Sequence, residues 1–187
     1  MHKFFELLLL LGLCLNAHAA FDLEPDLVDT LKQRAERNIA VLPDDLRNQY
    51  LSYINEYPDG LMAYLISAEK SGILWDANPD DVLSNYLQIR NLCSVENFQQ
   101  SSEFFLSYIA KITVSHERIT AYREEMLRKG LDTIRENNPD MVDRIRATNL
   151  WCRENMVFVS TSGRTMDPLS VLNKSKTGRC GEMQVFF

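Results

Sequence analysis

The chain has 187 residues, of which 45% are hydrophobic and 25% are charged, and its formal net charge is -6 at pH 7. These proportions match those of globular proteins and exclude a chain too polar to bury a core. The isoelectric point of about 5.1 argues against binding to the phosphate backbone of a nucleic acid as a main role.

Residues 1–19 have the pattern of a secretory signal peptide. His2 and Lys3 form a short basic beginning, the nearly all-leucine stretch 7–15 forms an apolar core, and Ala17-His18-Ala19 is a small-x-small cleavage site. The apolar run is too short to span a bilayer. Leucine directly before Cys14 fits lipid attachment poorly. We therefore expect a secreted or periplasmic protein, cleaved near Ala19, with no membrane contact after cleavage.

Residues 20–138 are predicted to form a leader region of successive helices. Asn78-Pro79-Asp80-Asp81 is a clear helix start, because it combines a cap residue, a proline in the first turn and two acids at the positive end of the helix dipole. Further helices are expected over 104–112 and from about 117 to 136. Apolar residues recur at helical spacing at Leu27, Leu31 and Ala35, at Leu46, Tyr50 and Ile54, at Leu61, Leu65 and Ala68, and at Val82, Tyr86, Ile89 and Cys93.

The leader either faces a substrate or supports the packing of the rest of the protein. Several of its aromatic side chains could line a groove for a sugar or a peptide, although aromatics at helical spacing usually belong to a core. These residues are Tyr50, Tyr53, Tyr57, Tyr64 and Trp75.

The sequence pattern changes after residue 138, where we place the boundary of a second region, 139–187. A helix follows Pro139, with Val142, Ile145, Asn149 and Cys152 at helical spacing. The β-favouring stretch 156–160 then predicts a short strand, and 161–168 is rich in turn-forming residues. The predicted fold class is therefore α+β, with a helical N-terminal region before a region that begins a sheet.

Cys180 is a candidate nucleophile in its thiolate form. It lies between Gly178-Arg179 and Gly181-Glu182. A cysteine attacks as the thiolate, which is favoured at a helix N-terminus and beside a positive charge such as Arg179. The two glycines would let a substrate carbonyl approach the sulfur, while the backbone N–H of Cys180 points at the developing oxyanion. Glu182 suits the first turn of such a helix. The alternative for Cys180 is a small buried hydrophobic residue.

Three cysteines remain after signal cleavage, namely Cys93, Cys152 and Cys180. An odd number in an exported protein indicates either one disulfide and a free thiol or three free thiols. The sequence leaves both arrangements open.

The segment from about Asn149 to Phe187 resembles the beginning of a transglutaminase-like domain of the papain-like thiol superfamily. Gly178-Arg179-Cys180-Gly181-Glu182 matches the cysteine motif of that family, and a peptide N-glycanase has a similar string but continues with tryptophan where this chain has Met183. The helix with Asn149-Leu150-Trp151, the short strand and Asp167-Pro168-Leu169 also resemble the family layout.

The resemblance implies a Cys-His-Asp thiol hydrolase or acyltransferase whose histidine and aspartate follow the cysteine, beyond Phe187. We therefore expect a longer protein, of which this chain is an inactive front part. Of the three histidines, two lie in the signal peptide and His116 precedes the cysteine, where a solvated surface role is the expectation. The predicted reaction is attack of the Cys180 thiolate on an amide carbonyl of a protein, peptide or glycopeptide, giving a thioester that water or an amine resolves. Neither a cofactor nor a metal is expected.

The resemblance also suggests that Trp151 and Asn149, on a helix before the cysteine, help to hold the oxyanion. An indole N–H only donates, which suits that task. Packing of Trp151 in the core is the alternative. For the whole protein, the alternatives are a non-catalytic binding module on a degenerate transglutaminase-like fold, or a helical scaffold in which the motif is coincidental.

Overall fold

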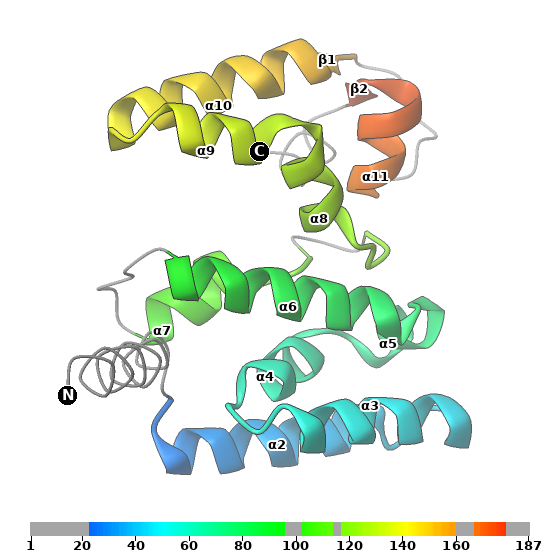
Figure 1. Cartoon of the computed structure of the whole chain (residues 1–187). Coiled ribbons are helices and arrows are strands. Elements are labelled where there is room, and N and C mark those ends of the chain that lie inside the picture. The colour runs from blue at the N-terminus through cyan, green and yellow to red at the C-terminus, as the bar shows by residue number, and fades with distance from the viewer. Residues whose placement is uncertain (1–22, 96–101, 114–116, 160–166, 179–187) are drawn as a thin grey trace, which may run out of the picture.

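The computed structural model describes residues 23–95, 102–113, 117–159 and 167–178, and its helices form two layers (Figure 1). The first layer contains α2 (Pro25–Ile39), α3 (Asp44–Glu56), α4 (Leu61–Ala68), α5 (Ser71–Asp76), α6 (Pro79–Val95), α7 (Ser102–Phe104) and the π-helical segment η1 (Phe105–Ala110). The second layer contains α8 (Tyr122–Met126), η2 (Leu127–Leu131), α9 (Asp132–Asn137), α10 (Met141–Asn155), β1 (Val157–Phe158), α11 (Pro168–Ser170), η3 (Val171–Ser175) and β2 (Thr177–Gly178).

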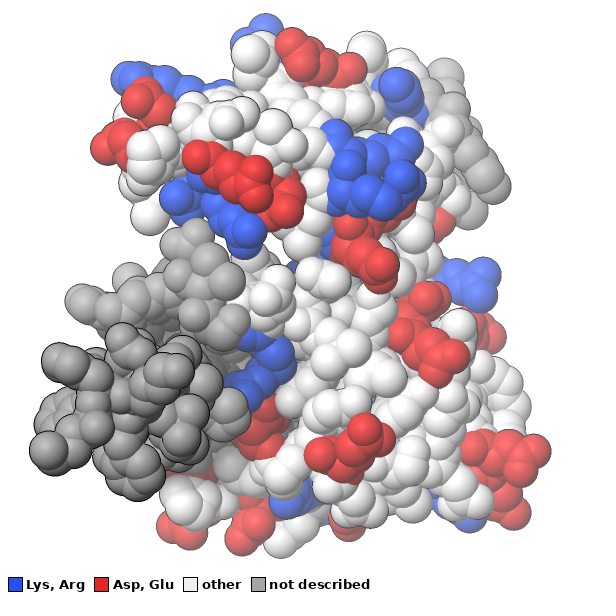
Figure 2. Space-filling view, viewed as in Figure 1, with Lys and Arg blue, Asp and Glu red and all other residues white. Residues whose placement is uncertain are grey.

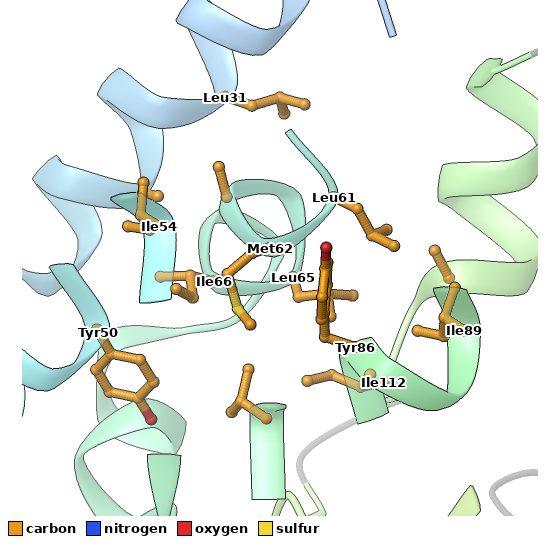
Figure 3. Close-up of a cluster of buried hydrophobic side chains, with 14 of the residues drawn as sticks. Leu31, Tyr50, Ile54, Leu61, Met62, Leu65, Ile66, Tyr86, Ile89 and Ile112 are labelled. Atoms are coloured by element: carbon orange, nitrogen blue, oxygen red, sulfur yellow. The ribbon is translucent and has the colours of Figure 1, made fainter. Parts of the chain in front are cut away.

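The first layer is built around α4, which is almost entirely apolar. Leu61, Met62, Leu65 and Ile66 are buried on different sides of this helix, so neighbouring helices surround it. Figure 3 shows α4 nearly end-on, with these four side chains directed outward. The side chains that pack around them include Leu31, Tyr50, Ile54, Tyr86, Ile89 and Ile112. The helices predicted around Leu27, Leu46, Leu61 and Val82 are thus confirmed as α2, α3, α4 and α6.

The second layer has a smaller hydrophobic cluster of its own. It consists of Met126, Trp151, Cys152, Met156, Val171 and Leu172. The first cluster ends at Ile119, and Tyr122 already packs against the second. The helices from α8 to α9, which the sequence places in the leader region 20–138, therefore pack with the second cluster. The domain boundary near residue 138 stays a prediction.

The helix predicted over 117–136 begins later than expected, at Tyr122, and residues 117–121 are not helical. Ile119 is buried in the first cluster, and the Thr120 carbonyl accepts a hydrogen bond of 2.8 Å from the Asn85 amide. The Ile119 side chain and the Thr120 carbonyl are therefore held by tertiary contacts, which compete with helix formation in this segment. The helix that does form is also interrupted at Gly130, whose φ is 134°.

The buried face of α10 differs from the predicted one. Val142 and Ile145 are 52% and 53% exposed, and Asn149 is also exposed, whereas Cys152 is buried as expected. Trp151 and Cys152 are the side chains of α10 that enter the second cluster. The apolar spacing correctly predicted a helix, but it did not show which side the second layer would cover.

The short strand predicted over 156–160 is confirmed as β1. It pairs in parallel with β2, in the register Val157 with Thr177 and Phe158 with Gly178. The described residues are mostly helical, as predicted for this part of the chain. The α+β class stays a prediction.

Candidate functional site

Cys180, the predicted nucleophile, lies outside the described residues, as do His116 and the predicted signal peptide, residues 1–19. The description ends at Gly178, two positions before the cysteine. What can be built from the structure is therefore the segment that leads to the motif, residues 167–178, and the residues against which it packs.

This segment begins with a capped helix. Asp167 accepts hydrogen bonds of 3.1 Å from the backbone N–H groups of both Leu169 and Ser170, and Pro168 occupies the first helical position. A capping carboxylate and a proline that has no N–H both suit a helix start, where the backbone N–H groups have no helical partner. The sequence Asp167-Pro168-Leu169 therefore defines where this helix begins.

The far end of the segment is attached to the end of α10 through the two strands. Lys176 leaves the helix in the left-handed region, with a φ of 48°, and its N–H donates to the Val171 carbonyl at 2.8 Å. Its carbonyl accepts a hydrogen bond of 2.8 Å from the N–H of Val157. Between the two ends, Val171 and Leu172 are buried in the second cluster. The approach to the cysteine motif is thus held at both ends and along its apolar side.

Trp151 lies in the same cluster, but its indole is engaged with the backbone. Its Nε1–H donates to the Lys129 carbonyl at 3.2 Å. Asn149 lies on the exposed side of α10, and its side-chain amide donates to the Ile145 carbonyl at 3.0 Å. The contacts of Trp151 support the packing alternative, and the oxyanion roles of Trp151 and Asn149 stay predictions.

Gly130, which the sequence analysis did not single out, makes room for the Trp151 indole. A Cβ at this position would lie 3.1 Å from Trp151 Nε1, and the φ of 134° is one that L side chains rarely adopt. The backbone conformation therefore favours glycine here, and an added Cβ would also make the Trp151 ring shift by a few tenths of an ångström.

We expect Gly130→Ala to lower the free energy of unfolding by about 1–3 kcal/mol, because the methyl group combines backbone strain with a displaced Trp151. Urea denaturation followed by tryptophan fluorescence measures this loss. Gly72→Ala is the matched control, since Gly72 lies in α5 with nothing within 4 Å of an added Cβ. That variant should be neutral or more stable by up to about 1 kcal/mol. Equal effects of the two changes would show that Gly130 is not required.

The two described cysteines are free thiols, so Cys93 and Cys152 do not form a disulfide. Each is buried, Cys93 in the first cluster and Cys152 in the second. Burial raises the pKa of Cys93 to about 11, and it also raises the pKa of Cys152. Both thiols are therefore inert near neutral pH, since the thiolate is the reactive form.

The described surface has open grooves. One groove of about 500 Å³ is lined by Lys70, Gly72, Ile73, Asp76, Glu117 and Arg118. Another, of about 310 Å³, lies where α8 meets α11 and is lined by Ala121, Glu124, Glu125, Arg128, Leu169 and Asn173. On the face seen in Figure 2, acidic and basic side chains are interspersed. Tyr50, one of the aromatics considered for a ligand groove, is instead buried in the first cluster.

Comparison of the chain with protein-family models, with curated proteins and with solved structures gave no match. Within the described ranges, no group of three or more histidine, cysteine or acidic side chains is arranged to hold a metal ion. Every described helix is too short or too polar to cross a membrane.

Proposed function

We propose that the chain belongs to an exported transglutaminase-like enzyme in which the Cys180 thiolate attacks an amide carbonyl of a protein, peptide or glycopeptide. The motif Gly178-Arg179-Cys180-Gly181-Glu182 supports the proposal at the level of sequence. The structural observation that supports it is the anchoring of residues 167–178, which are capped by Asp167, packed against the second cluster and paired with β1. A nucleophile needs a fixed approach, because a small displacement from the attacking geometry costs a large part of the rate.

The proposed reaction has two steps. The sulfur adds to the amide carbonyl, the oxygen takes up the negative charge, and the amine leaves with a proton, so that a thioester remains on Cys180. Water then adds to the thioester, which releases a carboxylic acid and restores the thiol; an amine in place of water gives a new amide. The described residues contain no histidine, so the histidine that the family uses to take the thiol proton is not among them.

We expect Cys180 to ionise at a lower pH than an ordinary thiol, whose pKa is about 8.5, because Arg179 and a helix start would both favour its negative charge. The rate of iodoacetamide labelling measured against pH should therefore have its midpoint below that value. Buried Cys93 and Cys152 should stay unlabelled in the folded protein.

Cys180→Ser should abolish this labelling, and Cys152→Ser should leave its midpoint in place. A midpoint at the ordinary value, or labelling that survives in Cys180→Ser, would contradict an activated Cys180. Because the resemblance implies a catalytic histidine beyond Phe187, the reaction itself is tested on a protein that includes that region, by Cys180-dependent release of a free amine from a peptide amide. An activated thiol without such release would favour the non-catalytic binding module.

A further inference from the structure

A buried carboxyl group connects α4 with the segment that leads from the first layer to the second. Glu69 directly follows α4, and its side chain is only 5% exposed. Its Oε2 lies 2.6 Å from the hydroxyl of Thr113, which is buried as well. Its Oε1 is also buried and has no hydrogen-bond partner within the described part of the chain. A carboxylate in this position would keep the Thr113 hydrogen bond at Oε2, but no hydrogen bond would replace the lost water at Oε1.

The groups around Glu69 shift its pKa in opposite directions. Among the described residues, the charged or titratable side chains that interact with it are Tyr64 on α4, Lys111 and Glu117 in the connecting segment, and Tyr122 on α8. Burial raises the pKa of Glu69. The hydrogen bond from the Thr113 side chain, the positive charge of Lys111 and a hydrogen bond from the Thr113 backbone lower it, and the negative charge of Glu117 raises it. Glu117 is itself only 3% exposed. The net effect is a raised pKa.

The segment that Glu69 contacts is also held from the second layer. Arg123 of α8 donates to the carbonyl of Ile109 at 3.0 Å and to that of Lys111 at 2.8 Å. Residues 109–113 therefore lie between a contact from α4 and a contact from α8. Ala110 and Ile112 of this segment are also buried in the first cluster, so a change at Glu69 would loosen one of several attachments.

We propose that Glu69 and Thr113 form a pH-sensitive latch, in which the protonated carboxyl helps to keep residues 109–113 against the end of α4 and its ionisation loosens this contact. The direction of the pH dependence follows from the linkage between proton binding and stability. The closed latch binds the proton more tightly than the open one, so the stability of the closed form is fully present below the ordinary pKa of a glutamate and is lost as pH rises through the raised pKa of Glu69. The opening constant should increase by up to about tenfold per pH unit in that window, since one proton is released.

Hydrogen–deuterium exchange of the whole chain between pH 5 and pH 9 tests the latch, after correction for the intrinsic pH dependence of amide exchange. In the wild-type protein, the protection of peptides that cover 105–113 should fall as pH rises. Glu69→Gln should remove this dependence, because the amide can still accept from Thr113 but does not ionise. Glu36→Gln is the matched control, since Glu36 is exposed on α2, and it should behave as the wild type does.

Thr113→Val keeps the carboxyl and so tests the latch even if Glu69→Gln does not fold. Removal of the hydroxyl takes away a hydrogen bond that favours the charged form, so the pH dependence should remain and its midpoint should move to higher pH. Protection that is the same at every pH in the wild type would overturn the latch. An unchanged pH dependence in Glu69→Gln, or an unchanged midpoint in Thr113→Val, would do so as well.

Discussion

Replacement of Arg123 with methionine should lower the free energy of unfolding by about 3 kcal/mol, because the change leaves several acceptors without a partner. The guanidinium donates to Asn85 Oδ1 at 3.2 Å and to the carbonyls of Ile109 and Lys111. It also lies over the Tyr122 ring, 4.9 Å from its centroid. Asn85 is fully buried, so water cannot replace the lost hydrogen bond there. Replacing a buried charge can be harmless when its partners are replaced too, but here the partners stay.

Chemical denaturation followed by circular dichroism measures this loss, and Arg128→Met is the matched control. Arg128 is an exposed arginine of the second layer whose ion pair is with Glu125, one helical turn away. Exposed pairs of this kind contribute about 0–1 kcal/mol, so this variant should unfold close to the wild type. If both variants lost the same stability, the contacts of Arg123 would not stabilise the packing of the two layers.

Replacement of Leu65 with alanine should lower the free energy of unfolding by about 2–5 kcal/mol, the range seen when a buried leucine leaves a cavity. Leu65 is only 1% exposed and lies on α4, around which the first cluster is built. Because the surrounding helices enclose α4, the space that the side chain leaves cannot be filled without moving an entire helix. For a chain of this length, a loss of this size lowers Tm by roughly 4–20 °C.

Scanning calorimetry of Leu65→Ala beside Leu87→Ala checks this expectation. Leu87 is on α6 and 47% exposed, so its truncation removes apolar surface that water already reaches. We expect a loss within about 0.5 kcal/mol for that control. A small effect of Leu65→Ala would mean that α4 is not the centre of a tightly packed core.

Local patterns were sufficient to predict most of the elements. The apolar spacing around Leu31, Tyr50 and Leu65 predicted α2, α3 and α4, because each helix must bury one side and the spacing of its apolar residues follows the helical turn. Asn78-Pro79 predicted the start of α6 in the same way, and the β-favouring run after Met156 predicted β1. The candidate site depends on the cysteine motif alone, and Cys180 and its reactivity stay predictions.

The buried side of α10 and the conformation around Ile119 depended on tertiary packing. The spacing of Val142, Ile145 and Cys152 was helical, yet the second layer covers only the side of α10 that carries Trp151 and Cys152. Ile119 was predicted to lie in a helix, but it is buried in the first cluster as part of a non-helical segment. The spacing of apolar residues predicts that a helix has an apolar side, but it does not predict which element packs against that side.

The sequence by itself determined most of the helices, the short strand and the motif at Cys180, because each depends on residues within a few turns of one another. The capped helix start at Asp167 is equally local, although it was not predicted. Only the tertiary structure decided that Glu69 and Thr113 meet, that Gly130 lies under Trp151 and that Arg123 joins the two layers. These contacts join residues far apart in the chain, and they exist only when whole helices pack together, so no local pattern contains them.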